Sequence, residues 1–226
     1  MGKPLLAYTA EAARAATRLA RIVLSTDDPE IAMFGKSVGI EVPFLRPAEL
    51  AKDNTPTIPV LQDVVRRLEA EGERYDATFL LQPTNPLRTA ADIDGAIALL
   101  EETGADSVIS FVDAGERHPA RMKQIGDDGK VIDPPFAEQF EGQPRQQLPK
   151  FYLREGSVYL TRMDVLMSQH SLKGKDCRAW LIPEERAWNI DTPFDLFIVE
   201  QMMKASLRET AKRQETAKLQ ETANGQ

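Results

Sequence analysis

Cysteine is almost absent from this 226-residue chain, and long hydrophobic runs are absent altogether. The single cysteine, Cys177, excludes an internal disulfide and a cysteine-based metal cluster, so we interpret it as a small, half-buried apolar side chain. No apolar run approaches the roughly 20 residues that cross a membrane, and the sequence does not open with a signal-peptide pattern. These absences predict a cytoplasmic protein that does not span a membrane.

An excess of positive charge is also missing. The chain has 28 Lys and Arg against 35 Asp and Glu, a net charge of -7. It therefore has no general positive field for a nucleic acid polymer or an anionic membrane, and any nucleotide must be bound locally. The length fits one main α/β domain, which we place at residues 1–207. The polar remainder, 208–226, repeats Gln-Glu-Thr-Ala and is predicted to be a frayed helix or disordered.

Short apolar segments alternate with helical patterns along most of the chain. Segments typical of buried strands are 22–25, 77–81, 106–112, the start of GSVYLTRMDVL, and DCRAWLIP. Amphipathic helical patterns lie between several of them, for example at 57–72. This alternation predicts a doubly wound, mostly parallel sheet that binds ligands at the carboxyl edge of its strands.

Three helix starts carry capping patterns, in which a short polar side chain caps the first turn. They are Asp28 before Pro29, Thr89 with Asp92, and Thr192 with Pro193 and Asp195. The last two have the spacing of a capping box. We therefore interpret Asp195 as a capping residue rather than a metal ligand.

From about residue 117 the alternation stops. Asp127, Asp128 and Gly129 are typical of a hairpin turn, so residues 117–156 are predicted to form an antiparallel excursion from the main sheet. His118 stands at its start. Its ordinary pKa near neutrality would suit acid-base catalysis, but we favour a histidine that anchors the base of the excursion.

The stretch FLLQPTNPLRTAADID predicts a strand, a polar loop and a helix, and such a loop would face a ligand. Gln82, Thr84 and Asn85 offer hydrogen bonds, and Arg88 offers a cation for an anionic group. The alternative is that the prolines and Thr89 only shape the turn, and that Arg88 pairs with a carboxylate of the helix.

Seven stretches follow one another in the order and character of one family. They are GKPLLAYTAEAA, VLSTDDPEIA, VPFLRPAELAKD, LLQPTNPLR, HPARM, PRQQLPKFYLREGSVYL and NIDTPFDL. Up to its C-terminal tail the chain resembles the acylneuraminate cytidylyltransferases. The resemblance implies a nucleotidyltransferase-type α/β fold, a homodimer formed through the antiparallel excursion, and transfer of CMP from CTP to a nine-carbon sugar acid with release of pyrophosphate.

The resemblance also implies site residues. It places Gln82, Thr84 and Asn85 against the nucleotide and sugar, and Arg145, Gln147 and Arg154 near the substrate's carboxylate and phosphates. Planar guanidinium groups match paired oxygens; the alternative is that both arginines are solvated loop charges. Glu155 departs from the asparagine usual in the family, and its carboxylate would repel an anionic sugar unless it is paired or turned away.

The stretch NIDTPFDL resembles the family's magnesium site, where two aspartates are separated by one residue. This chain has Asn189 in the first place and Asp191 in the second. An amide oxygen can coordinate Mg²⁺ but adds no charge, so we expect weaker metal binding. Asp191 is the expected ligand, with Asn189 as a possible second.

The family opens with a strand and a phosphate-binding loop that have no counterpart before GKPLLAYT in this sequence. Without that strand, the sheet should contain a gap or two exposed edges. Two explanations are open: a longer enzyme whose start lies upstream, or a degenerate relative that binds a sugar nucleotide or only dimerises. We expect these 226 residues alone to be weakly active or inactive. A cytidylyltransferase for 3-deoxy-manno-octulosonate is a further alternative.

Overall fold

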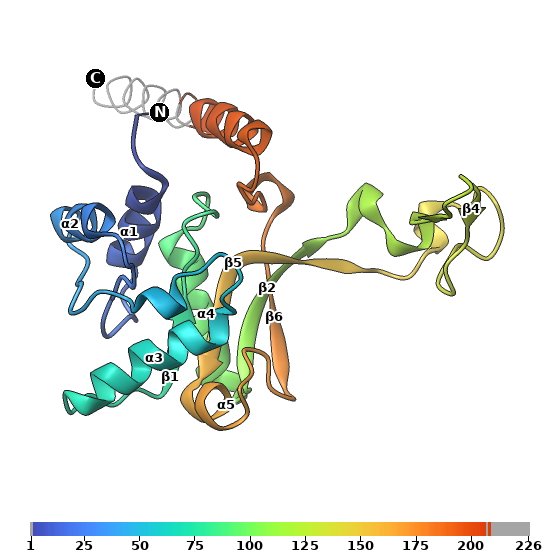
Figure 1. Cartoon of the computed structure of the whole chain (residues 1–226). Coiled ribbons are helices and arrows are strands. Elements are labelled where there is room, and N and C mark those ends of the chain that lie inside the picture. Colours follow the sequence, from blue (N-terminus) through green and yellow to red (C-terminus); the bar gives the residue numbers. More distant parts are fainter. Residues whose placement is uncertain (1, 207, 209–226) are drawn as a thin grey trace, which may run out of the picture.

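The computed structural model describes residues 2–206 and 208, which form an α/β domain with a projecting arm (Figure 1). The helices are α1 (Leu5–Ala15), α2 (Pro29–Ser37), α3 (Thr57–Ala70), α4 (Ala90–Thr103) and α5 (Met163–Ser168), followed by a helix over 193–206. The strands are β1 (Ala77–Leu80), β2 (Ser107–Asp113), β3 (Gln124–Ile125), β4 (Val131–Ile132), β5 (Tyr152–Arg162) and β6 (Cys177–Leu181). Apart from residue 208, the predicted tail at 208–226 lies outside the described residues.

The main sheet has the strand order β1-β5-β2-β6. β5 is antiparallel to both of its neighbours, β1 and β2, whereas β2 and β6 are parallel. The sheet is therefore mixed, not mostly parallel as predicted. The predicted β-α-β unit is present, because α4 connects β1 to β2 and these two strands run in the same direction. β5 returns from the arm in the opposite direction and lies between them.

The core lies between α4 and the sheet. Ala96 of α4 is fully buried, as are Val108 of β2 and Val158 of β5. The helix lies very close to β6, since a Cβ built on Gly95 would be only 2.2 Å from the indole ring of Trp180. A residue larger than glycine would push the helix off the sheet at this point.

The predicted helix starts are confirmed where they are local. The Asp28 side chain accepts hydrogen bonds from the first-turn amides of α2, with Pro29 at the first helical position. At α4, Thr89 and Asp92 form both halves of the predicted capping box. These caps need only residues within one turn of each other, which is why the sequence alone predicts them.

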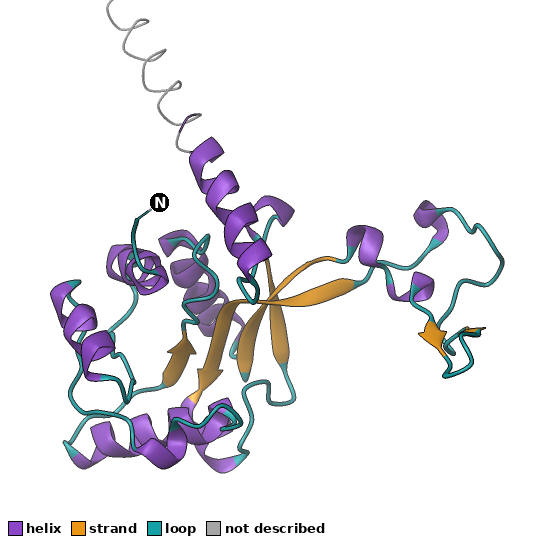
Figure 2. Cartoon of the chain, turned by 45° about the horizontal axis from the view of Figure 1, so that its top comes forward, coloured by secondary structure: helices purple, strands orange, loops and turns teal. Residues whose placement is uncertain are grey.

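The predicted antiparallel excursion is an arm carried on the extended ends of β2 and β5 (Figures 1 and 2). The β3–β4 hairpin forms near its far end, where Gln124 pairs with Ile132. At the base, His118 donates from Nε2 to the Pro149 carbonyl at 2.8 Å, and its ring meets Phe151 edge-on at 5.1 Å between centroids. These contacts agree with the interpretation of His118 as an anchor of the arm.

The segment predicted as a buried strand at 22–25 is not part of the sheet. It forms an isolated parallel bridge between Val23 and Glu41, and its residues are only half-buried until Thr26. A cleft of about 1840 Å³, lined by this segment, α3 and β1, separates it from the outer edge of β1. Within the described residues no strand lies between the 22–25 segment and β1, so the two are not joined by backbone hydrogen bonds. β1 is therefore an edge strand of the sheet, and the cleft lies along its outer edge.

Candidate functional site

Two loops meet at one edge of the sheet. β1, β2 and β6 run in the same direction, so the loop at 82–89 and the segment at 182–191 both follow the carboxyl ends of strands. The amide of Ile190 donates to the carbonyl of Thr84 at 2.9 Å. This hydrogen bond brings the predicted residues Gln82, Thr84 and Asn85 close to Asn189 and Asp191.

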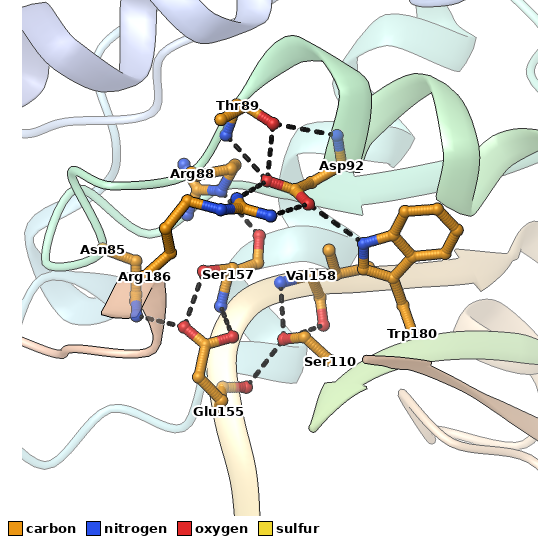
Figure 3. Close-up of polar contacts among 10 residues, drawn as sticks. All are labelled: Asn85, Arg88, Thr89, Asp92, Ser110, Glu155, Ser157, Val158, Trp180 and Arg186. Atoms are coloured by element: carbon orange, nitrogen blue, oxygen red, sulfur yellow. Dashed lines mark hydrogen bonds and ion pairs between the residues drawn. The ribbon is translucent and has the colours of Figure 1, made fainter. Parts of the chain in front are cut away.

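Glu155 of β5 holds the 82–89 loop from below. Its carboxylate is 7 % exposed and accepts hydrogen bonds from Asn85 Nδ2 at 2.8 Å and from Ser157 Oγ at 2.6 Å (Figure 3). A Cβ on Gly156 would lie 2.5 Å from Asn85 Oδ1, so glycine permits this close approach. Glu155 is therefore buried and its carboxylate is paired with Asn85 and Ser157. A carboxylate held in this way need not repel an anionic sugar. Asn85 is 1 % exposed, and its direct contact with a substrate stays a prediction.

Arg88 lies beneath the same loop and is 4 % exposed. Its guanidinium donates from Nε to the Ser157 carbonyl at 2.6 Å and from Nη2 to the Gln82 carbonyl at 2.8 Å. Burial lowers the pKa of Arg88 to about 10, although the charges of Glu155 and Asp92 act in the opposite direction. Nη1 also donates to the Thr9 hydroxyl at 3.5 Å, so Arg88 joins the loop to β5 and α1, and the predicted contact with an anion stays a prediction.

Asp92 joins the start of α4 to β6 and to the turn η5 (Glu184–Arg186). Arg186 donates to both carboxylate oxygens, one of them at 3.0 Å, and Trp180 Nε1 donates to Oδ1 at 3.2 Å (Figure 3). Thr89 completes the cluster through its amide and hydroxyl. Burial alone would raise the pKa of Asp92, but the hydrogen bonds from Arg186, Thr89 and Trp180 outweigh it and hold the pKa below its ordinary value.

Asn189 and Asp191 lie side by side at the end of the second loop. Asn189 Nδ2 donates to Asp191 Oδ2, while Asn189 Oδ1 is buried and has no hydrogen-bond partner among the described residues. An unpaired amide oxygen beside a carboxylate fits Mg²⁺, which takes only one or two protein carboxylates and completes its shell with water and phosphate oxygens. Within residues 2–206 no cluster of three or more His, Cys, Asp or Glu side chains is placed to hold a metal ion.

Asp195 caps the following helix, as predicted. Its carboxylate accepts from the Thr192 amide at 2.8 Å, and its own amide donates to Thr192 Oγ1 at 3.2 Å. The side chain is therefore committed to the helix start.

Arg145, Gln147 and Arg154 lie on the arm and its stem, and the structure does not bring them to the two loops. Arg145 Nη1 is 3.2 Å from Glu116 Oε1, and half of its side chain is exposed. Gln147 is exposed in the same short turn (Arg145–Gln147), and Arg154 is exposed directly before Glu155. Their roles toward a substrate stay predictions.

The cleft is lined by some polar groups for which the sequence alone predicted no role. Thr26, Arg46 and Lys52 line it together with Gln82 and Pro83 of the loop. Arg46 is held by Ser25, whose hydroxyl accepts from Nε at 3.1 Å. The available signal was the stretch VPFLRPAELAKD, which carries the resemblance and contains both basic residues.

Solved structures share this fold. The chain superposes on a CMP:2-keto-3-deoxy-manno-octonic acid synthetase in complex with CTP, with a TM-score of 0.66, 16 % identity and coverage of 91 % of this chain and 90 % of that one. It also matches 4-diphosphocytidyl-2C-methyl-D-erythritol synthase from Anaerococcus prevotii, with a TM-score of 0.61, 13 % identity and coverage of 90 % and 87 %. These likenesses show that the chain has the α/β fold of these two synthases.

The sequence comparisons are more specific. A family model described as cytidylyltransferase matches residues 1–172, so the chain belongs to the cytidylyltransferase family of enzymes. The chain is 31 % identical to post-translational flagellin modification protein B of Campylobacter coli, over 88 % of this chain and 84 % of that protein. It is 29 % identical to CMP-N,N'-diacetyllegionaminic acid synthase of Legionella pneumophila, over 90 % and 86 %. These relatives confirm the resemblance drawn from the sequence.

Within residues 2–206 each helix is too short or too polar to cross a bilayer.

Proposed function

We propose that this chain transfers CMP from CTP to a hydroxyl of a nine-carbon, nonulosonic sugar acid. The sugar oxygen bonds to the α-phosphorus, and the bond from that phosphorus to the oxygen that bridges to the β-phosphate breaks. Pyrophosphate leaves with the bridging oxygen, and the hydroxyl proton passes to solvent. Relatives are named for legionaminic, neuraminic and pseudaminic acids, which supports this substrate class.

The Ile190–Thr84 hydrogen bond carries the proposal, because it joins the loop proposed to contact CTP to the pair proposed to hold Mg²⁺. Gln82 is half-buried and lines the cleft, and Thr84 is half-buried two residues later in the same loop. Arg46 and Lys52 also line the cleft and add positive charge to it. For Arg145, Gln147 and Arg154, contact with the sugar acid is proposed from the resemblance.

Asn189 and Asp191 would hold the magnesium ion. Bound Mg²⁺ screens the phosphate charges and so lowers the barrier to attack at the α-phosphorus. One carboxylate and one amide attract a divalent cation less strongly than two carboxylates. We therefore expect the site to depend strongly on the phosphate oxygens of CTP for its affinity.

We further propose that the arm forms a homodimer with a second copy of the chain. Large apolar side chains are exposed along it, including Ile125 and Val131 at 66 % and Phe136 at 55 %. Soluble monomers rarely expose so many such residues together. Val131→Asp should convert a dimer to a monomer in sedimentation experiments, whereas Glu141→Gln, also on the arm, should not. A wild-type chain that is monomeric at tens of micromolar would contradict the proposal.

Pyrophosphate release tests the reaction directly. The chain is assayed with CTP, Mg²⁺ and a panel of nine-carbon sugar acids, beside a version with a phosphate-binding loop and strand added at its N-terminus. We expect weak or no release from the chain itself and clear release from the extended version. Asp191→Ala should abolish that release, whereas Asp164→Ala on α5 should leave it unchanged.

The same assay separates the alternatives. CTP binding without release from either version would support a sugar-nucleotide-binding relative instead of an enzyme. With the eight-carbon acid 3-deoxy-manno-octulosonate added to the panel, release with that acid alone would contradict the proposed nine-carbon substrate.

A further inference from the structure

An ion pair between Asp92 and Arg186 joins the two segments that the proposed function places in one site. Asp92 lies three residues after the end of the 82–89 loop, and Arg186 lies three residues before Asn189. Although 94 residues apart in the chain, the two side chains face each other, and Arg186 donates from Nη1 to Asp92 Oδ2 and from Nη2 to Asp92 Oδ1 (Figure 3). Such a bidentate pair fixes direction as well as distance.

Asp92 is the fixed partner of the pair. It is 3 % exposed and is held by Thr89 on its own helix and by Trp180 from β6. Trp180 is in turn pressed against the backbone of Gly95. The carboxylate therefore has no freedom to follow Arg186 if the segment that carries Arg186 moves.

Arg186 belongs to a segment with few other attachments to the loop. In the described part of the chain, residues 184–191 form hydrogen bonds with residues 82–92 at two places. One is the Arg186–Asp92 pair, and the other is the amide of Ile190 on the carbonyl of Thr84. The Ile190 amide lies between Asn189 and Asp191 in the chain. Since the segment has only these two attachments to residues 82–92, the position of Asn189 and Asp191 depends on how firmly Arg186 is held.

We propose that Asp92 and Arg186 are positioning residues, which hold Asn189 and Asp191 at the distance from the 82–89 loop that a metal-bound CTP requires. This inference rests on the proposed function. In this role neither the Asp92 nor the Arg186 side chain contacts the substrate. Arg186 acts through the backbone of residues 187–191, and Asp92 supplies the fixed point on the sheet.

Amide hydrogen exchange tests the positioning without any ligand. In Arg186→Met the side chain keeps its length but loses its charge, and exchange of the Ile190 amide should rise at least tenfold. Arg178→Met is the matched control, because Arg178 lies on β6 and forms an exposed pair with Asp176. It should leave Ile190 exchange unchanged. Asp92→Asn provides a second variant with an uncharged partner of the same shape.

CTP binding with and without Mg²⁺ then tests the link to the site. By titration calorimetry, Arg186→Met should weaken CTP binding about tenfold in Mg²⁺ and less than twofold in EDTA, because only the metal-holding segment is displaced. A change that merely destabilised the protein would weaken both equally.

The outcomes separate this inference from the proposed function. Unchanged Ile190 exchange in Arg186→Met, or equal losses of CTP affinity with and without Mg²⁺, would overturn the inference. Faster exchange in a protein whose wild type binds no CTP would count against the proposed function, yet it would support the pair as the attachment of residues 187–191.

Discussion

The two sides of β1 differ in how completely the protein covers them. On one side β5, β2 and β6 pair in register and α4 covers them, so that Val108 and Val158 are fully buried. On the other side Val23 and Glu41 form a single bridge, and a cleft of about 1840 Å³ lies between that bridge and β1. We call these the closed side and the open side.

The difference shows which parts of the proposed site are fixed by the fold. The loop at 82–89 and the segment at 184–191 are both attached to the closed side, through Glu155, Arg88 and the Asp92–Arg186 pair. Arg46 and Lys52 belong to the open side. The positions of Asn189 and Asp191, proposed to hold the metal, therefore do not depend on what occupies the cleft. The positions of Arg46 and Lys52 depend on where the open side lies.

The largest expected effect compares one isoleucine from each side. Ile109 of β2 is buried within the closed side, whereas Ile22 is half-buried beside the cleft. Ile109→Ala should lower the free energy of unfolding by about 4 kcal/mol, because it leaves a cavity in a packed core. Ile22→Ala should cost about 1 kcal/mol, as expected for a side chain already in contact with water. Urea denaturation measures both, and equal losses would show that the open side is as well packed as the closed one.

An added strand should reduce the contrast between the two sides. An extended apolar segment joined to the N-terminus should enter the cleft and pair with the outer edge of β1. We expect it to raise the free energy of unfolding by about 2 kcal/mol, since apolar burial of its side chains exceeds the cost of ordering them. A segment of equal length with its apolar residues replaced by serine is the control. Equal stability of the two versions would show that the cleft does not accept a strand.

Features that depend on residues close together in the sequence could be predicted, whereas features that depend on residues far apart in the sequence could not. The capping boxes at Thr89 and Thr192 were predictable, because each needs two side chains three positions apart. The direction of β5 was not, because an apolar strand pattern is the same for parallel and antiparallel pairing. The position of Arg88 was hidden in the same way, because one of its partners, the Ser157 carbonyl, is 69 residues away in the chain. Its contact with an anion stays a prediction.

The attachment of the 82–89 loop can be loosened at Gly156. In Gly156→Ala the new Cβ would lie 2.5 Å from Asn85 Oδ1 and 3.1 Å from Gln82 Oε1, so the loop must move away from β5. We expect a loss of about 2 kcal/mol in stability and weaker CTP binding. Gly126→Ala on the arm is the control, because its Cβ would meet mainly the mobile end of Asp128. Wild-type stability and CTP affinity in Gly156→Ala would show that the loop has room to adjust.

The smallest expected effect is an acid dependence of two carboxylates on α4, Asp92 and Asp94. Against the opposing effect of burial, hydrogen bonds from Arg186 and Thr89 hold the pKa of Asp92 below its ordinary value, and the hydrogen bond from the Thr17 amide holds the pKa of Asp94 below its own. A carboxyl whose pKa is lower in the folded state contributes stability above its unfolded pKa, near 4, and loses it as the pH falls through the folded value. Asp92→Asn should therefore be less stable than wild type at pH 7, and the difference should narrow below about pH 4. Asp94→Asn should show the same trend more weakly, because its carboxylate is more exposed to solvent. Urea midpoints measured from pH 7 to pH 3 separate the two, and a larger acid effect at Asp94 would show that its exposed hydrogen bonds to Thr17 stabilise the fold more than the buried Asp92 cluster does.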